Sequence, residues 1–293
     1  MAETDLDMRK LRYFVAVAEE LNFGRAAQRL HVAQPVLSRQ IRAFEEELGG
    51  VLLFERNSRG TALTAAGTQL LQDARFMLAE SKALRERLFQ ADSGTITVSV
   101  GVLPGLLATA AVRLFESADP THRAQVLPVG WDEQVTILTT GEVDVVYARE
   151  PFDHRGLGIA PLLDEPRVVL ISTADPLAAK PSLRLANLAS RRLLQDPATA
   201  PEWYAVADAE QRRASSRKSA STVEEKLELV AAQKGFAILP RSTTKFYRRP
   251  DVRVIPIDDA GPSRVALIWD AATTNQARDE FVTAALMCRD QTI

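Results

Sequence analysis

The chain has 293 residues, of which 46% are hydrophobic, with a formal net charge of -2 at pH 7 and a sequence pI of about 6.0. This length suffices for two or three packed units, and the charge balance excludes a positive field over the whole surface. Nucleic-acid binding would therefore need a local cluster of cations and would weaken as salt rises. The single cysteine, Cys288, excludes an intrachain disulfide. With no long apolar run and no signal-like start, the sequence predicts a cytoplasmic protein.

Two short helices joined by a tight turn are predicted between Phe23 and Gly49. The sequence of the first helix is NFGRAAQRL, that of the turn is HVAQ and that of the second helix is PVLSRQIRAFEEELG. The alanines of the first helix, Ala26 and Ala27, permit a close helix crossing. An amphipathic helix is predicted before this pair, because apolar residues recur there at helical spacing. Those residues are Leu11, Phe14, Ala18 and Leu21.

The second helix of the pair has one apolar face and one polar, cationic face. Its apolar residues are Leu37, Ile41, Phe44 and Leu48. The residues expected to contact DNA lie opposite this stripe or at the helix start: Gln34, Pro35, Ser38, Arg39 and Arg42. Such a helix fits the major groove, where Arg39 would reach guanine edges or phosphate and Arg42 phosphate. A solvated helix face is the alternative for either arginine considered alone.

A two-stranded hairpin is predicted after Gly49. The runs VLLFERN and TALT flank Ser58-Arg59-Gly60, which places Gly60 in the turn. Arg56 and Arg59 would lie along the hairpin or at its tip. Considered alone, these arginines are ordinary hairpin charges.

A long helix is predicted from Ala65 to about Gln90, because Thr64 is a good cap and no proline interrupts the run. Apolar and small residues recur along this helix at intervals that alternate between four and three residues. This heptad spacing forms one stripe and predicts a dimerisation seam, at which the helix would pack against a partner helix. The seam consists of Leu70, Ala74, Met77, Ser81, Leu84 and Leu88. The alternative is a single helix that lies on its own domain. Charged residues on the other faces favour a partner helix.

Strands alternate with helices after Gly94, which predicts an α/β unit with a parallel sheet. A second unit follows Pro151, and the run RVALIWDAA is expected to return to the first unit. Two lobes with a cleft between them result, with lobe I at 95–148 and 264–293 and lobe II at 151–259. In α/β sheets, ligands bind beyond the carboxyl ends of the strands and at helix N-termini.

The N-terminal sequence resembles that of the winged helix-turn-helix of LysR-type transcriptional regulators. The match runs from Met8 to Gly67 and contains LRYFVAVAEELNFGRAAQRLHVAQPVLSRQIRAFEEELGGVLLFER, then LTAAG. The whole chain resembles the family in length and layout. One departure is Ala33, where the family usually has Ser or Thr. An alanine at this helix start forgoes a cap worth about 1 kcal/mol and a hydroxyl for phosphate contact.

The resemblance implies a multidomain chain: a winged helix-turn-helix rich in α-helix (1–64), a dimerising linker helix (65–91) and a two-lobed α/β effector domain (95–293). The effector domain would have the type 2 periplasmic-binding-protein fold. The wing arginines, here Arg56 and Arg59, would reach the DNA backbone or minor groove. The implied partners are two-fold double-stranded promoter DNA, a small-molecule effector, RNA polymerase and the chain itself, as a dimer or dimer of dimers.

Candidate effector-binding residues follow from the expected strand ends and helix starts. They are Leu103, Pro104, Trp131, Arg149, Ser221 and Thr222. A hydroxyl pair at a helix N-terminus, with Arg149 opposite, suits a carboxylate effector. The segment GVLPG, the first loop of the expected effector domain, lacks the hydroxyl group that effector-binding relatives often have there. Together with Trp131, this predicts either a more apolar site, for an aromatic or bulky ligand, or a degenerate one.

Enzyme chemistry has no support in the sequence. His31, His122 and His154 lie far apart, and no Cys or carboxylate spacing resembles a zinc site, so neither metal nor cofactor is predicted. The sequence contains no phosphate-binding loop and no serine nucleophile with a neighbouring base. The predicted function is a sequence-specific DNA-binding regulator, modulated by a small-molecule effector in the cleft. The alternatives are a cytosolic solute-binding module and a LysR-like regulator without effector control.

Overall fold

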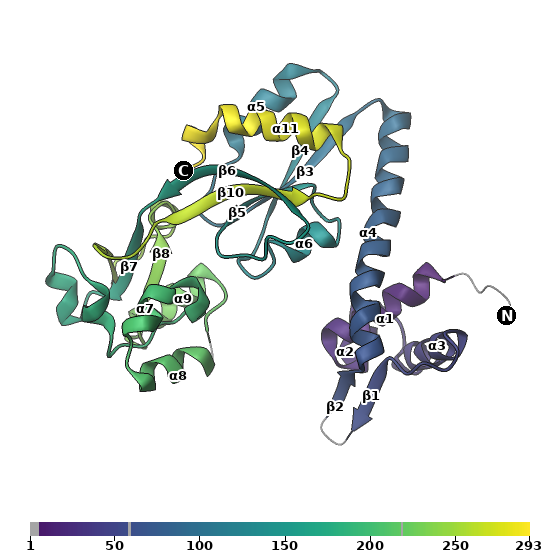
Figure 1. Ribbon diagram of the computed structural model, residues 1–293, viewed down its shortest axis with the longest axis horizontal. Helices are drawn as coiled ribbons and strands as arrows, with labels where there is room; N and C mark the ends of the chain where they lie inside the picture. Colours follow the sequence, from purple (N-terminus) through teal and green to yellow (C-terminus); the bar gives the residue numbers. More distant parts are fainter. Residues whose placement is uncertain (1–5, 58–59, 218) are drawn as a thin grey trace. The chain divides into compact units, whose positions relative to one another are not determined.

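The computed structural model describes residues 6–57, 60–217 and 219–293 (Figure 1). The chain divides near Asp92 into two compact units, an N-terminal unit and a C-terminal unit. The N-terminal unit consists of helices and a hairpin, and the C-terminal unit combines helices with sheets. Within the described residues, no helix has both the length and the apolar character needed to cross a membrane.

The N-terminal unit begins with short helices and a hairpin and ends with a long helix. Its elements are α1 (Met8–Glu20), α2 (Phe23–Arg29), α3 (Gln34–Glu47), β1 (Phe54–Asn57), β2 (Gly60–Leu63) and α4 (Ala65–Ser93). Asn22 caps α2, because its Oδ1 accepts hydrogen bonds from the backbone N–H groups of Gly24 at 2.9 Å and Arg25 at 3.0 Å. No side chain caps α3 at Ala33, as expected of an alanine. Pro35 in the first turn has no N–H to satisfy, which lowers the cost of this bare start.

The core of the N-terminal unit holds α3 by its apolar stripe. Leu37, Ile41 and Phe44 are buried, as the spacing predicts. The ring of Phe14 on α1 lies between those of Phe44 and Phe54, at centroid distances of 6.5 Å and 5.5 Å. These contacts from the helices and the hairpin fix which face of α3 points outward.

The first half of α4 belongs to this same core. Leu70, Ala74 and Met77 pack against it, and Ala74 has no exposed surface. The structure therefore corrects the first half of the predicted seam, which serves packing within the chain. Farther along α4, Leu84 is 52% exposed and Leu88 is 63% exposed. Ser81, half-buried, lies between the two parts.

The larger sheet of the C-terminal unit has the strand order β4-β3-β5-β10-β6. Its strands are β3 (Ile96–Val102), β4 (His122–Pro128), β5 (Val145–Arg149), β6 (Leu157–Glu165) and β10 (Ser263–Asp270). Strands β3, β4 and β5 are parallel, as predicted, whereas β10 runs antiparallel to β5 and β6. Helices α5 (Thr109–Ala118) and α11 (Gln276–Met287) pack on each other beside this sheet (Figure 1). A short helix, α6 (Thr136–Thr139), precedes β5.

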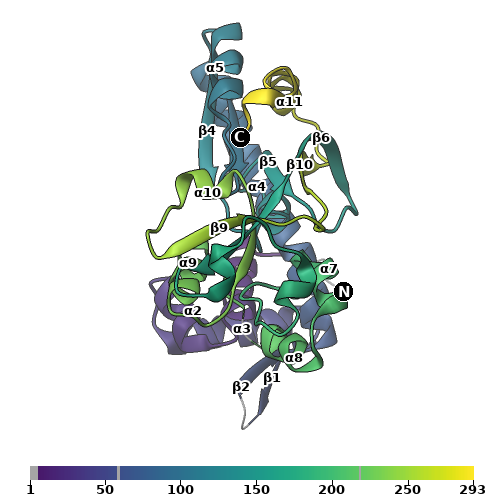
Figure 2. The ribbon, with the colours of Figure 1, turned by 90° about the vertical axis from the view of Figure 1, so that its left-hand side faces the viewer.

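The smaller sheet, β8-β7-β9, is antiparallel. Its strands are β7 (Arg167–Ser172), β8 (Ala237–Pro240) and β9 (Val252–Pro256). Alternate residues of β7 face two different hydrophobic cores. One core lies beneath α9, and the other contains Trp203 of α7. Figure 2 shows α7 and α9 on opposite sides of this lobe. The helices are α7 (Pro201–Val206), α8 (Ala209–Arg217), α9 (Val223–Ala231) and α10 (Thr243–Phe246), with the 3-10 turns η1 (Pro176–Ala179), η2 (Leu185–Leu188) and η3 (Pro197–Thr199), and with η4 (Arg289–Gln291) at the chain end.

The chain passes between the sheets later than predicted. Strand β6 pairs with β10 along its whole length, from Leu157 opposite Asp270 to Glu165 opposite Ser263. Residues 157–165 therefore belong to the first lobe, although the sequence analysis placed 151–259 in the second. Pro166, between β6 and β7, marks the outward crossing, and the chain returns between β9 and β10. The physical reason is that strand pairing, which local spacing does not encode, decides to which sheet a strand belongs.

Candidate DNA-binding face and effector cavity

The outward face of α3 carries the residues predicted to contact DNA. Gln34, Pro35, Arg39 and Arg42 are exposed, and Ser38 is half-buried. In the part of the chain that the structure describes, no hydrogen bond or ion pair engages the guanidinium group of Arg39 or Arg42. Both cations are therefore available to an external anion.

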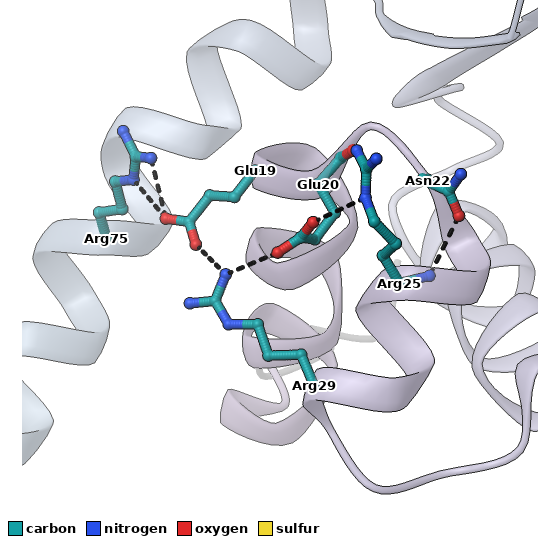
Figure 3. Close-up of polar contacts among 6 residues, drawn as sticks. All are labelled: Glu19, Glu20, Asn22, Arg25, Arg29 and Arg75. Carbon is teal, nitrogen blue, oxygen red and sulfur yellow. Dashed lines mark hydrogen bonds and ion pairs between the residues drawn. The ribbon is translucent and has the colours of Figure 1, made fainter. Parts of the chain in front are cut away.

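Other arginines of the same unit are paired with carboxylates, as Figure 3 shows. Glu19 of α1 binds Arg29 of α2 at 2.7 Å and Arg75 of α4 at 2.9 Å. The neighbouring Glu20 binds Arg25 at 3.1 Å. The two glutamates thus connect α1 to α2 and α4, and the arginines that they bind have a structural role. The structure separates these arginines from Arg39 and Arg42, a distinction that charge counting in the sequence does not make.

Glu45 of α3 is a positioning residue that sequence reasoning missed. Its Oε1 accepts hydrogen bonds from the backbone N–H groups of Leu53 at 2.8 Å and Phe54 at 3.4 Å. It thereby ties the start of the hairpin to the recognition helix. In the sequence, this glutamate is one of three in a row and carries no signal that distinguishes it.

The predicted wing is present as the hairpin of β1 and β2. The strands pair antiparallel from Phe54 opposite Leu63 to Asn57 opposite Gly60. The backbone of Arg56 lies in β1, opposite Thr61. The side chain of Arg56 and the whole of Arg59 lie outside the described residues, so their predicted DNA contacts stay predictions.

A cavity of about 70 Å³ lies between the lobes of the C-terminal unit. The first lobe contributes Trp131, which follows β4, and Ser263 at the start of β10. The second lobe contributes Ser221 and Lys226 from the start of α9. Trp131 and Ser221 are the two predicted effector-binding residues that line this cavity.

Lys226 is a buried, charged lining residue that the sequence did not predict. Its side chain is buried, with 5% of its surface exposed, and its Nζ donates to the backbone carbonyl of Ser221 at 3.2 Å. The Nζ also lies 5.9 Å from the ring centroid of Trp131, within the range of a cation–π contact. A signal existed in the sequence, because Lys226 occupies the apolar stripe formed by Val223, Leu227 and Val230. A lysine at such a position is unusual on a helix that packs against a core.

Arg149 does not line the cavity but lies buried behind it. Its guanidinium pairs with Glu165 and donates to the hydroxyl groups of Ser263 at 3.1 Å and Ser242 at 2.8 Å. Burial lowers the pKa of Arg149, and the charge of Glu165 opposes this effect. The group joins the ends of β5 and β6, the start of β10 and the loop after β8, where the two lobes meet. The structure thus corrects the predicted position of Arg149 opposite a ligand.

The remaining predicted effector residues also lie away from the cavity lining. Leu103 is 1% exposed and belongs to the core of the first lobe. The carbonyl of Pro104 accepts a hydrogen bond from the Thr243 hydroxyl of the second lobe at 3.2 Å. Thr222 caps α9, since its Oγ1 accepts from the backbone N–H of Glu225 at 3.1 Å. Local spacing placed these residues near strand ends and helix starts, but Leu103 packs in a core, the carbonyl of Pro104 contacts the other lobe and the side chain of Thr222 caps α9.

No group of three or more His, Cys, Asp or Glu side chains suited to a metal ion occurs among the residues that the structure describes. His122 stacks on Phe115 at a centroid distance of 4.4 Å, and its Nε2 lies 3.3 Å from Glu280. This histidine therefore packs in the first lobe and is not part of the cavity lining.

Comparisons with known proteins give a consistent result. Residues 8–68 match the family described as bacterial regulatory helix-turn-helix protein, lysR family, and residues 89–286 match the LysR substrate binding domain. YnfL of Escherichia coli strain K12, an uncharacterized HTH-type transcriptional regulator, is 34% identical over 279 residues, which cover 90% of this chain and 92% of YnfL.

The solved structure of CbnR, a LysR family transcriptional regulator, is 27% identical, with a TM-score of 0.63 over 95% of this chain and 98% of CbnR. Full-length CbnR complexed with its target DNA gives 26% identity and a TM-score of 0.59 over the same shares of the two chains. The curated relatives and these solved structures are regulators, and the likeness covers both units of the chain.

Proposed function

Because the chain belongs to the LysR family of bacterial transcriptional regulators, we propose that it binds a two-fold promoter site as a dimer or dimer of dimers. The chain is a DNA-binding regulator with an effector-binding domain, and its relatives are regulators rather than enzymes. The observation that supports the mode of DNA binding is the outward face of α3. There, Arg39 and Arg42 are exposed and form no hydrogen bond or ion pair with the described residues, while Arg25, Arg29 and Arg75 are paired.

We assign different roles to the residues of α3 and the wing. Gln34, Pro35 and Ser38 lie in the first turns of α3, where a recognition helix meets base edges. Arg39 reaches guanine or phosphate, and Arg42 binds phosphate. Arg56 and Arg59 of the wing bind the backbone or the minor groove. The backbone N–H of Gln34 at the uncapped α3 start is a further phosphate donor, since Pro35 has no N–H and those of Val36 and Leu37 donate to Ala33.

The second half of α4 pairs with the same helix of a partner chain. Leu84 and Leu88 are exposed there, and a partner helix would remove their apolar surface from water. A two-fold pair of α4 helices presents two α3 faces, which explains the expectation of a two-fold DNA site.

The effector binds in the cavity between the lobes and favours one lobe arrangement over another. Such an effect requires that the ligand bind the two arrangements with different affinity. The cavity meets this requirement, because residues of both lobes line it and any change of lobe spacing alters their separation. This reading is preferred over a regulator without effector control, because the cavity contains a buried cation, Lys226. We also propose that the protein acts in the cytoplasm and contacts RNA polymerase at its promoters.

The test is a footprint of the purified full-length protein on the DNA upstream of its own gene, at two salt concentrations. We expect protection over two half-sites related by two-fold symmetry, weakening as salt rises because bound cations displace counterions from phosphate. Selection of bound sequences from a random DNA pool covers sites that lie elsewhere. A folded protein that protects no upstream DNA and enriches no sequence from the pool would refute the proposal.

A further inference from the structure

Lys226 is a buried cation without a counter-ion. Within the described residues, its Nζ has one hydrogen-bond acceptor, the carbonyl of Ser221, and forms no ion pair with a carboxylate. An ammonium group has three donors, and buried charges in folded proteins are normally paired. Burial lowers the pKa of Lys226, and the charge of Asp132 opposes that effect most. Glu225 and Glu224 act in the same direction as Asp132, but no described carboxylate is in ion-pair contact with the Nζ. The ligand-free site therefore contains a buried charge that has no carboxylate in direct contact.

A second donor at the same cavity wall also lacks an acceptor. The indole Nε1 of Trp131 is buried and has no hydrogen-bond partner in the described part of the chain. Lys226 and Trp131 face each other across the lobe boundary, with the Nζ 5.9 Å from the ring centroid. Unsatisfied buried polar atoms are rare in native structures and require an explanation. Two such donors beside one cavity indicate that the missing acceptor comes from a ligand.

The carboxylates of the cavity lining do not supply this acceptor. Asp132 and Asp196 are exposed, and Asp196 already caps η3 through the N–H of Ala198 at 2.9 Å. Glu150 pairs with Arg264 at 3.3 Å. Acidic groups thus occupy the solvated part of the lining, where water stabilises them. The buried part contains Lys226.

We propose that the effector is a small organic anion whose negative group binds Lys226, with the ring of Trp131 against its organic part. This inference rests on the proposed function, because it assigns a chemical class to the ligand of the effector cavity. A water molecule would supply an acceptor but no charge, whereas a carboxylate supplies both. The cavity volume of about 70 Å³ limits the ligand to a small molecule unless the lobes move apart. One water needs about 10–15 Å³ by the same measure.

The test uses the full-length protein and pairs of probes that differ only in charge. Acetate, butyrate and benzoate are compared with acetamide, butyramide and benzamide at constant ionic strength. We expect at least one acid to raise the unfolding temperature and change tryptophan fluorescence in a saturable manner, while its amide does neither. If no acid has a larger effect than its amide, the proposal is overturned.

Two variants identify the residue that binds the anion. Lys226→Met keeps the length of the side chain and removes its charge, and we expect it to weaken binding of the active acid by about tenfold or more. Lys180→Met removes an exposed lysine as the matched control and should leave binding unchanged. Equal binding by Lys226→Met and the wild type would overturn the proposal. So would equal losses in both variants, because these would indicate a nonspecific charge effect.

The ligand-free variant gives a second readout. Removal of an unpaired buried charge should raise the unfolding temperature of the Lys226→Met protein above that of the wild type, so loss of anion binding cannot be attributed to misfolding. An unfolding temperature below that of the wild type would contradict the unpaired state of Lys226.

The same preparations are tested for DNA binding, which separates the two proposals. If the wild type protects a two-fold DNA site but no acid has an effect, the regulator proposal stands and the anion proposal fails. If the acid binds through Lys226 but no DNA is protected or selected, the proposed DNA-binding mode fails and the anion site stands.

Discussion

Two buried cations of the C-terminal unit lie near the same tryptophan, and they differ in what surrounds them. The guanidinium carbon of Arg149 and the Nζ of Lys226 are each 5.9 Å from the ring centroid of Trp131. Arg149 has a carboxylate and two hydroxyl groups as partners, whereas Lys226 has one backbone carbonyl. The charge of Arg149 is thus paired with a carboxylate of the chain and that of Lys226 is not, although the Nε of Arg149 has no hydrogen-bond partner in the described residues. A buried cation with its own carboxylate fixes structure, and one without a carboxylate is suited to binding.

The N-terminal unit shows the same contrast at its surface. Arg29 shares Glu19 with Arg75 and so joins two helices, while Arg39 has no partner in the described residues. The two arginines are close in sequence and have identical chemistry. The position of a carboxylate decides which of them is structural and which is available to DNA.

The largest expected effect comes from breaking the buried ion pair of Arg149 and Glu165. Glu165→Ala leaves the guanidinium of Arg149 buried without a counter-ion, and we expect the free energy of unfolding of the C-terminal unit to fall by about 3–5 kcal/mol. Trp131, Trp203 and Trp269 all lie in this unit, so urea unfolding of the full chain followed by tryptophan fluorescence measures it. Asp153→Ala removes an exposed partner of Arg155 and serves as the control. A loss no larger than that of the control would refute the structural role of the buried pair.

The next effect tests which half of α4 pairs with a partner chain. Leu84→Glu combined with Leu88→Glu should weaken association by about 2–3 kcal/mol per chain, the value of burying exposed leucine surface. Sedimentation equilibrium of the full-length protein measures this change. Met77→Glu is the contrasting variant, because Met77 packs in the core of its own unit and its change should lower helix stability by circular dichroism. Unchanged association of the Leu84 and Leu88 variant would exclude this stripe as the interface.

The third prediction concerns the unpaired surface arginine. Arg39→Ala should weaken binding to the selected DNA site by about 1–3 kcal/mol and leave the unfolding temperature unchanged. Binding is measured by fluorescence anisotropy at two salt concentrations. Arg29→Ala is the matched control, since its guanidinium is already paired with Glu19 and its loss should leave affinity nearly unchanged. Equal losses of affinity in the two variants would remove the distinction between paired and unpaired arginines.

The smallest effect is expected from the paired surface cluster. Glu19→Gln removes the carboxylate shared by Arg29 and Arg75, and we expect a loss of about 0–1 kcal/mol in the stability of the N-terminal unit, because these groups are partly solvated. Thermal unfolding followed by circular dichroism at low and high salt measures it. The difference from the wild type should shrink as salt rises. A loss as large as that of Glu165→Ala would show that burial does not set the value of an ion pair here.

Patterns within one element were predictable from the sequence. The stripe of α3 depends on residues three and four apart, so Leu37, Ile41 and Phe44 revealed both the helix and its buried face. The same spacing contained the signal for Lys226, whose charge interrupts an otherwise apolar stripe. The first half of the predicted α4 seam packs in the core of its own unit, because one stripe of a helix can face its own core over part of its length, and the partner contact of the second half stays a prediction.

Features that depend on distant residues were not predictable. Arg149 finds its partners 16, 93 and 114 residues away, in Glu165, Ser242 and Ser263. Nothing in the sequence around Arg149 indicates that its guanidinium group pairs with a carboxylate of the same chain. The lobe boundary failed for the same reason, since β6 is defined as part of the first sheet only by pairing with β10, on the far side of the second lobe in sequence.

The double attachment of Glu19 has a mechanical consequence. One carboxylate fastens α2 and α4 to α1, and the first half of α4 is fixed in the same core, so the winged helix-turn-helix and α4 move as a single lever. With 29 residues, α4 is roughly 43 Å long at a rise of 1.5 Å per residue. A tilt of about 5° about the C-terminal end of α4 displaces its other end, next to the winged helix-turn-helix, by roughly 4 Å, close to the rise of about 3.4 Å along the DNA axis for each phosphate of one strand. A small rotation of this arm therefore shifts a recognition helix by about one base-pair step.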